Sequence, residues 1–87
     1  MSALNKLSLT KLVMDRITEI ATSKGAKLPA VNADTVLLGG TLPIDSLDLA
    51  TIVVQLEATA NADPFRDGFV EFRTIGELAT LFANASN

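Results

Sequence analysis

Residues 42–57 read LPIDSLDLATIVVQLE, and no glycine or proline follows Pro43 until the chain has passed Asn61. Within this run the apolar residues with helical spacing are Leu47, Ala50, Val53, Val54 and Leu56. Asp45 is the expected N-cap, Ser46 follows in the first turn, and Asp48 adds a negative charge near the positive end of the helix dipole. We therefore predict a helix from Ser46 to about Asn61.

Two apolar side chains of this helix, Leu49 and Ile52, lie outside the predicted apolar face. The helix is then either buried on more than one side or exposes an apolar strip to a partner. We treat both residues as candidate partner contacts.

Upstream, residues 8–24 form a second predicted helix. Its apolar face comprises Leu9, Leu12, Val13, Ile17, Ile20 and Ala21. Ser8 is the expected N-cap, and Gly25 stands where a left-handed residue ends a helix. Residues 25–44 contain two prolines and three glycines and predict a long loop, with one helical turn over 34–38 capped by Asp34. A loop of this length in a small domain is usually functional or mobile.

Downstream, three phenylalanines at helical spacing, Phe65, Phe69 and Phe72, predict a short helix over 64–72 that packs its rings into the core, although Gly68 weakens it. A last helix opens at Thr74 with Glu77 as its capping-box partner. Its expected buried face is Ile75, Leu78, Leu81, Phe82 and Ala85. The sequence thus predicts an all-α single domain spanning 1–87, with three main helices, a short third one and a long loop after the first.

Composition excludes several functional classes. The 87 residues include no cysteine and no histidine, so disulfides, thiolate metal sites and the usual general base are missing. Residues 1–33 carry a net charge of +3, and residues 34–87 carry −6. An acidic surface of this kind disfavours nucleic acid and favours basic protein partners. No apolar run reaches the length of a membrane span, and we expect a cytoplasmic monomer.

Ser46 has two interpretations. It is a first-turn helix residue of purely structural value, or it is a modification site at a helix end whose free amides and dipole favour an added phosphate. It is not expected to be a nucleophile of the protein's own, because no histidine is present to take its proton. Asp45 and Asp48 as a catalytic acid pair are the weakest alternative, since capping already explains them. We expect no catalytic residue and no metal site.

The motif DSLDLATIVVQLE at the start of a long helix, with the long loop before it and the capped helix after it, resembles the acyl carrier protein family. The resemblance covers most of the chain and implies a four-helix bundle. It implies that Ser46 is esterified by 4'-phosphopantetheine from coenzyme A, delivered by a phosphopantetheinyl transferase that recognises Asp45 and Leu47. The arm would hold an acyl or aminoacyl group as a thioester, loaded by a ligase and used by downstream enzymes.

The resemblance also implies where partners and cargo bind. Partner enzymes would contact the helix after Ser46 at Asp48, Leu49, Ile52 and Glu57. An acyl chain would lie between the helices, lined by Val54, Phe69 and Ile75, although ordinary core packing also explains these residues. Fatty acyl, polyketide and aminoacyl cargo all remain open, because Thr51 and Gln55 make this helix less acidic than is usual in fatty-acid carriers and Gly39–Gly40 lies further from the serine than in peptidyl carriers. The alternative function is a helical interaction module with no prosthetic group.

Overall fold

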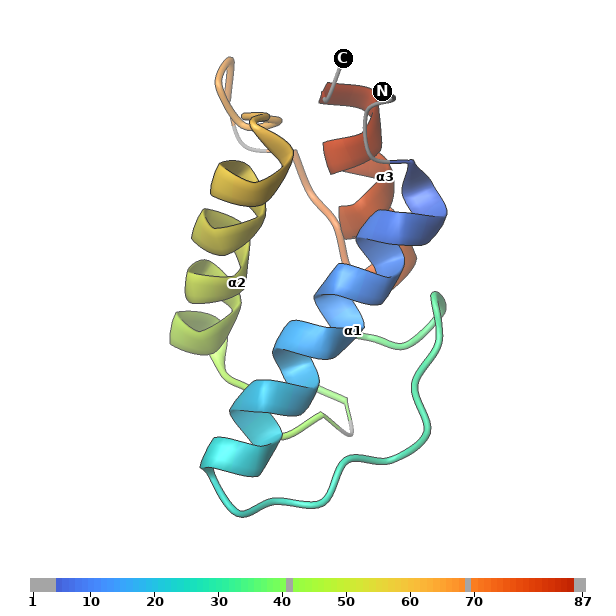
Figure 1. Cartoon of the computed structure of the whole chain (residues 1–87), viewed down its shortest axis with the longest axis vertical. Helices are drawn as coiled ribbons and strands as arrows, with labels where there is room; N and C mark the ends of the chain where they lie inside the picture. Colours follow the sequence, from blue (N-terminus) through green and yellow to red (C-terminus); the bar gives the residue numbers. More distant parts are fainter. Residues whose placement is uncertain (1–4, 41, 69, 86–87) are drawn as a thin grey trace.

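Three helices form the architecture of the part of the chain that the computed structural model describes, residues 5–40, 42–68 and 70–85. They are α1 (Lys6–Ser23), α2 (Ser46–Ala60) and α3 (Ile75–Ala85). Both α2 and α3 run antiparallel to α1 (Figure 1). The predicted all-α class is confirmed. None of the described helices has the length and apolarity that a membrane crossing requires.

The first helix begins earlier than predicted. Asn5 is its N-cap, and the Asn5 side chain accepts a hydrogen bond from the backbone N–H of Ser8 at 2.8 Å. Ser8 was therefore the wrong cap. The added turn contains Leu7, whose 80% exposure explains why apolar spacing gave no sign of it. The predicted end is confirmed, since Gly25 follows the helix with a φ of +69°.

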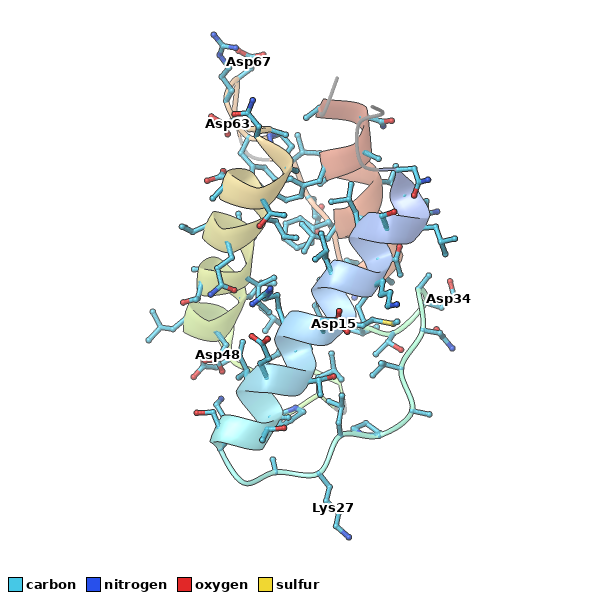
Figure 2. The ribbon with its side chains drawn as sticks, viewed as in Figure 1. Asp15, Lys27, Asp34, Asp48, Asp63 and Asp67 are labelled. Carbon is cyan, nitrogen blue, oxygen red and sulfur yellow. The ribbon has the colours of Figure 1, made fainter. Side chains whose placement is uncertain are left out.

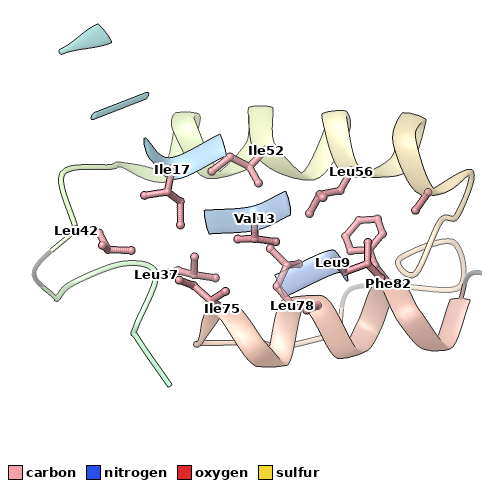
Figure 3. Packing of buried hydrophobic residues seen from close by; sticks show 12 residues of the cluster. Leu9, Val13, Ile17, Leu37, Leu42, Ile52, Leu56, Ile75, Leu78 and Phe82 are labelled. Atoms are coloured by element: carbon pink, nitrogen blue, oxygen red, sulfur yellow. The ribbon is translucent and has the colours of Figure 1, made fainter. Parts of the chain in front are cut away.

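A single apolar core lies between the helices (Figure 3). From α1 it takes a ridge at intervals of four residues, and this ridge is Leu9, Val13, Ile17 and Ala21. The other helices supply Ile52, Leu56, Ala60, Ile75, Leu78, Ala79 and Phe82, and the long loop supplies Leu37 and Leu42. Contacts of α1 with α3 are more extensive than those with α2, and α2 barely touches α3. Each outer helix is thus held mainly by α1.

The face that α2 buries differs from the predicted one. Ile52 is 0% exposed and belongs to the core, whereas Leu47 is 77% exposed and Val54 is 63% exposed. Leu49 and Val53 are half-buried against the core. Leu56 is buried as predicted, but the rest of the face was assigned wrongly in part, because α2 is apolar on most of its circumference. Apolar spacing alone could not choose which side meets α1.

The long loop is tied to the start of α3 by backbone hydrogen bonds. Leu37 N–H donates to Arg73 C=O at 2.8 Å, and Ile75 N–H donates to Thr35 C=O at 3.0 Å, which forms an isolated antiparallel bridge between Val36 and Thr74. Residues 34–38 therefore contain no helical turn. The Asp34 backbone N–H instead donates to the Asn32 side chain at 2.8 Å. The prediction failed because the pairing partner lies far along the chain.

The aromatic segment forms turns in its described residues, not the predicted helix. Turn hydrogen bonds join Arg66 N–H to Asp63 C=O and Gly68 N–H to Phe65 C=O, and Gly68 has a φ of +135° that a right-handed helix does not allow. The expected packing is found for two rings: Phe65 lies 5.8 Å from Phe72 and 6.4 Å from Phe82 between centroids. Phe69 lies outside the described residues. The four-helix bundle is not confirmed.

The last helix begins as predicted. Thr74 Oγ1 accepts from Glu77 N–H at 3.1 Å, and the Glu77 carboxylate accepts from Thr74 N–H at 3.1 Å and from Arg73 N–H at 2.7 Å. In the first turn of α3, Gly76 is buried and its N–H donates to Ala33 C=O at 2.7 Å. A Cβ at Gly76 would lie 3.0 Å from both the Cβ and the carbonyl oxygen of Ala33. Only glycine lets the loop approach this closely.

We predict that Gly76→Ala destabilises the fold by about 1 kcal/mol, because crowding against Ala33 outweighs the gain in helix propensity. Urea denaturation followed by circular dichroism measures this change. Gly40→Ala is the matched control: its Cβ would lie an ordinary 3.5 Å from the Val36 Cβ, and we expect a change within about 0.5 kcal/mol. An equal or higher stability of Gly76→Ala would contradict the tight approach.

Candidate functional site

The candidate site is the N-terminal end of α2, and its first turn is fixed by a capping box. Asp48 N–H donates to the Asp45 carboxylate at 2.9 Å, and Asp45 N–H donates to the Asp48 carboxylate at 3.1 Å. The predicted N-cap is therefore confirmed. The two carboxylates serve each other's backbone amides, which accounts for both acids without catalysis.

Ser46 is the first residue of α2 and is exposed. Within the described part of the chain its hydroxyl makes no hydrogen bond, because the acids on either side take over the capping. Leu47, the next residue, also faces solvent. First-turn amides have no partner within a helix, so this end also presents N–H donors and the positive end of the helix dipole. A hydroxyl here is accessible to another enzyme.

A lysine from the end of α1 joins this site. The Lys24 ammonium donates to Pro43 C=O at 3.2 Å and forms an ion pair with the Asp48 carboxylate. The hydrogen bond from Lys24, followed by that from the Asp45 backbone, lowers the pKa of Asp48 below its usual value. The same bond raises the pKa of Lys24. In Figure 2, Asp48 lies at the end of α2 that is nearest the last turns of α1.

The structure changes the candidate partner contacts. Asp48 is half-buried and already paired, so its charge is partly neutralised inside the molecule. Ile52 is fully buried and cannot touch a partner, and Leu49 packs partly against the core. Glu57 is half-buried on the following turns. The acidic recognition face that the sequence indicated is therefore reduced.

An uncharged strip runs along the outer side of α2 instead. We use the name outer strip for six exposed residues: Leu47, Ala50, Thr51, Val54, Gln55 and Ala58. Their spacing of three and four residues places them on one helix face beginning next to Ser46. The sequence contained this signal, because no charged residue occupies any of these positions. The predicted apolar face included three of the six, Leu47, Ala50 and Val54.

Known proteins give no guide to this site. No protein-family model, curated protein or solved structure matches this chain.

Two of the predicted cargo-lining residues, Val54 and Ile75, are not brought together. Val54 faces solvent on the outer strip, Ile75 is fully buried in the core, and Phe69 lies outside the described residues. A different apolar hollow of about 200 Å³ lies beside the first turns of α2. It is lined by Val36, Leu37, Leu38, Leu49, Phe72 and Arg73. Sequence spacing could not find it, because its walls come from three separate segments.

No group of three carboxylates that could hold a metal ion occurs among the described residues. The charged groups at the start of α2 are Asp45, Asp48 and Lys24, and two of the three are tied together as an ion pair. The arrangement supplies an accessible hydroxyl beside this ion pair.

We predict that folding stability falls in acid. Asp48 and Glu77 have pKa values lowered from 3.8 and 4.5 by hydrogen bonds in the folded chain. Their contribution to folding stability is therefore fully present above the unfolded-state pKa values of 3.8 and 4.5. It is lost as the pH falls through the lower pKa values of the folded state. The raised pKa of Lys24 makes its contribution complete below 10.5 and lost as the pH rises through the higher folded value.

Urea midpoints measured from about pH 2 to 11 check this dependence. Asp48→Asn and Glu77→Gln should each reduce the loss of stability at acidic pH. Lys24→Met should reduce the loss of stability at alkaline pH. The exposed Glu71 provides the control, and Glu71→Gln should retain the wild-type profile. An unchanged acid limb in the Asp48 and Glu77 variants would contradict the assignment.

Proposed function

We propose that this protein is a carrier of the acyl carrier protein type, with Ser46 as the attachment site of 4'-phosphopantetheine. The observation that carries the proposal is the exposed Ser46 hydroxyl, which is free of hydrogen bonds in the described chain and lies at the first position of a capped helix. Asp45 and Leu47 flank it as the residues that a transferase would recognise. The all-α class and the long loop before the site support the same function.

The residues present fit such a group. A phosphodiester on Ser46 would lie at the N-terminus of α2, where first-turn amides and the helix dipole stabilise negative charge by about 0.3–1 kcal/mol. The Asp45 and Asp48 carboxylates would both oppose the phosphate, and the pairing of Asp48 with Lys24 reduces part of that repulsion. Leu47 and Ala50 leave an apolar surface beside the arm.

In the transfer, the Ser46 hydroxyl oxygen forms a bond to the phosphorus that bears the pantetheine in coenzyme A. The bond to the second phosphate of the pyrophosphate breaks, adenosine 3',5'-bisphosphate leaves, and the hydroxyl proton passes to a base of the transferase. The arm supplies a terminal thiol, which holds the cargo as a thioester. This chain contributes the hydroxyl and its placement, and the catalysis belongs to the partner.

The partners under this proposal are the transferase, an acyl- or aminoacyl-loading ligase and enzymes that consume the thioester in a specialised biosynthetic pathway. We propose that the carrier acts as a monomer in the cytoplasm. The fourth, short helix of the family would correspond to residues 64–72, of which the described residues 64–67 form turns. The hollow of about 200 Å³ beside the first turn of α2 is the place that we propose for a short acyl group.

A second candidate function rests on the outer strip of α2. An uncharged, partly apolar helix face suits docking to another protein without any prosthetic group. Under this reading Ser46 is only the first residue of the helix. Partner binding would then be unchanged in Ser46→Ala and abolished by Val54→Glu.

We predict that a phosphopantetheinyl transferase, Mg²⁺ and coenzyme A add one phosphopantetheinyl group to the wild-type protein, as read by intact mass. Ser46→Ala should take up none, because the accepting oxygen is gone. Ser23→Ala, which removes another exposed helical serine, is the matched control and should be modified at the wild-type rate.

Folding must be separated from chemistry in this test. We expect Ser46→Ala to stay within about 0.5 kcal/mol of the wild-type stability, because Ser46 neither caps the helix nor packs in the core. If several transferases leave the wild-type protein unmodified, this result contradicts the carrier proposal and favours the interaction module.

A further inference from the structure

Lys24 joins the two ends of the long loop. It is the C-cap residue of α1, and its ammonium reaches across to Pro43 C=O and to the Asp48 carboxylate. Asp48 is the third residue of α2, two positions after Ser46. One side chain thus connects the end of α1, the last part of the loop and the first turn of α2.

The first turn of α2 has few other anchors. Ser46 and Leu47 are exposed, and Asp48 and Leu49 are only half-buried. The first fully buried residue of α2 is Ile52, which lies more than a turn further along. On the loop side, Leu42 is buried and Ile44 is half-buried. Polar contacts therefore contribute to the placement of this turn more than they do at the densely packed start of α3.

The contact also joins two capping interactions. The Asp48 carboxylate accepts from both Lys24 Nζ and Asp45 N–H, and Asp45 in turn caps the Asp48 amide. Losing Lys24 would leave Asp48 free to rotate away from the Asp45 amide. One half of the capping box would then weaken, and the turn that carries Ser46 would fray more often.

We propose that Lys24 is a positioning residue for the modification of Ser46: it holds the first turn of α2 against the end of α1, so that the hydroxyl is presented in one place. This inference rests on the proposed carrier function. Lys24 acts through Asp48 and Pro43 and does not touch the reacting atoms. It also offsets the negative charge of Asp48 next to the site that receives a phosphate.

The expected size of the effect follows from the exposure of the pair. Exposed ion pairs change local equilibrium constants by a few-fold. The equilibrium constant for opening of the first turn of α2 should therefore rise by about twofold to fivefold without Lys24. The interaction is screened by salt, and about 1 M NaCl should bring the wild type close to the variant. Global stability should change little.

The test uses Lys24→Met, which keeps the apolar stem and removes the charge, with Lys27→Met as the control at an exposed loop lysine. Two readouts are needed: the kcat/KM of phosphopantetheinyl transfer to each protein, and amide hydrogen exchange at Asp48 and Leu49. Lys24→Met should lower kcat/KM by about twofold to fivefold and speed exchange at both amides by a similar factor. Lys24→Arg should restore both, and Lys27→Met should change neither.

A double-variant comparison shows whether Lys24 acts through Asp48. Lys24→Met should have a smaller effect on transfer in an Asp48→Asn background, where the ion pair is already absent and the hydrogen bond to Pro43 C=O is the remaining contact of Lys24. The inference would be overturned if Lys24→Met accepted the phosphopantetheinyl group at the wild-type rate, or if amide exchange at Asp48 were unchanged in that variant. Either result would leave the carrier function intact. A wild type that accepts no group contradicts the carrier function itself, so the two failures are distinct.

Discussion

The apolar ridge of α1 supports both other helices. This ridge recurs every four residues, and its side chains are all buried: Leu9, Val13, Ile17 and Ala21. Among the helix pairs, α2 and α3 each have more contact with α1 than with each other. The position of Ser46 relative to α3 is therefore set indirectly, through α1 and through the contact that Lys24 makes at the end of that helix. A change in the tilt of α1 would move the site as well as the core.

The fold was predictable from the sequence where local interactions control it. Asp45 as N-cap, the Thr74–Glu77 capping box and Gly25 after α1 are set by residues within a few positions of one another, and all three were predicted. Non-local interactions gave the errors. The bridge between Val36 and Thr74 joins distant segments, so the loop was expected to contain a helical turn where it has an extended pair.

The candidate site shows the same division. The place of Ser46 at the helix start follows from Asp45 and the preceding proline. The pairing of Asp48 with Lys24 depends on how α1 ends against α2, which no local pattern reveals. The buried face of α2 was predicted only in part, with Leu56 correct and Leu47 and Val54 wrong, because apolar residues occupy most of the circumference of the helix. The α2 surface beside Ser46 is consequently more neutral than its acids suggested.

The extensive packing of α1 on α3 has a consequence for the folding of the chain. These two helices lie at opposite ends of the sequence, so the largest helix contact closes nearly the full length of the chain. Loop-closure entropy must be offset before that contact forms, and the backbone bonds between residues 33–37 and 73–76 require the same closure. Neither half of the protein contains a complete core: α1 and α2 together lack Ile75, Leu78 and Phe82. Folding is therefore cooperative over the whole domain, and a nascent chain can bury its core only after α3 has been synthesised.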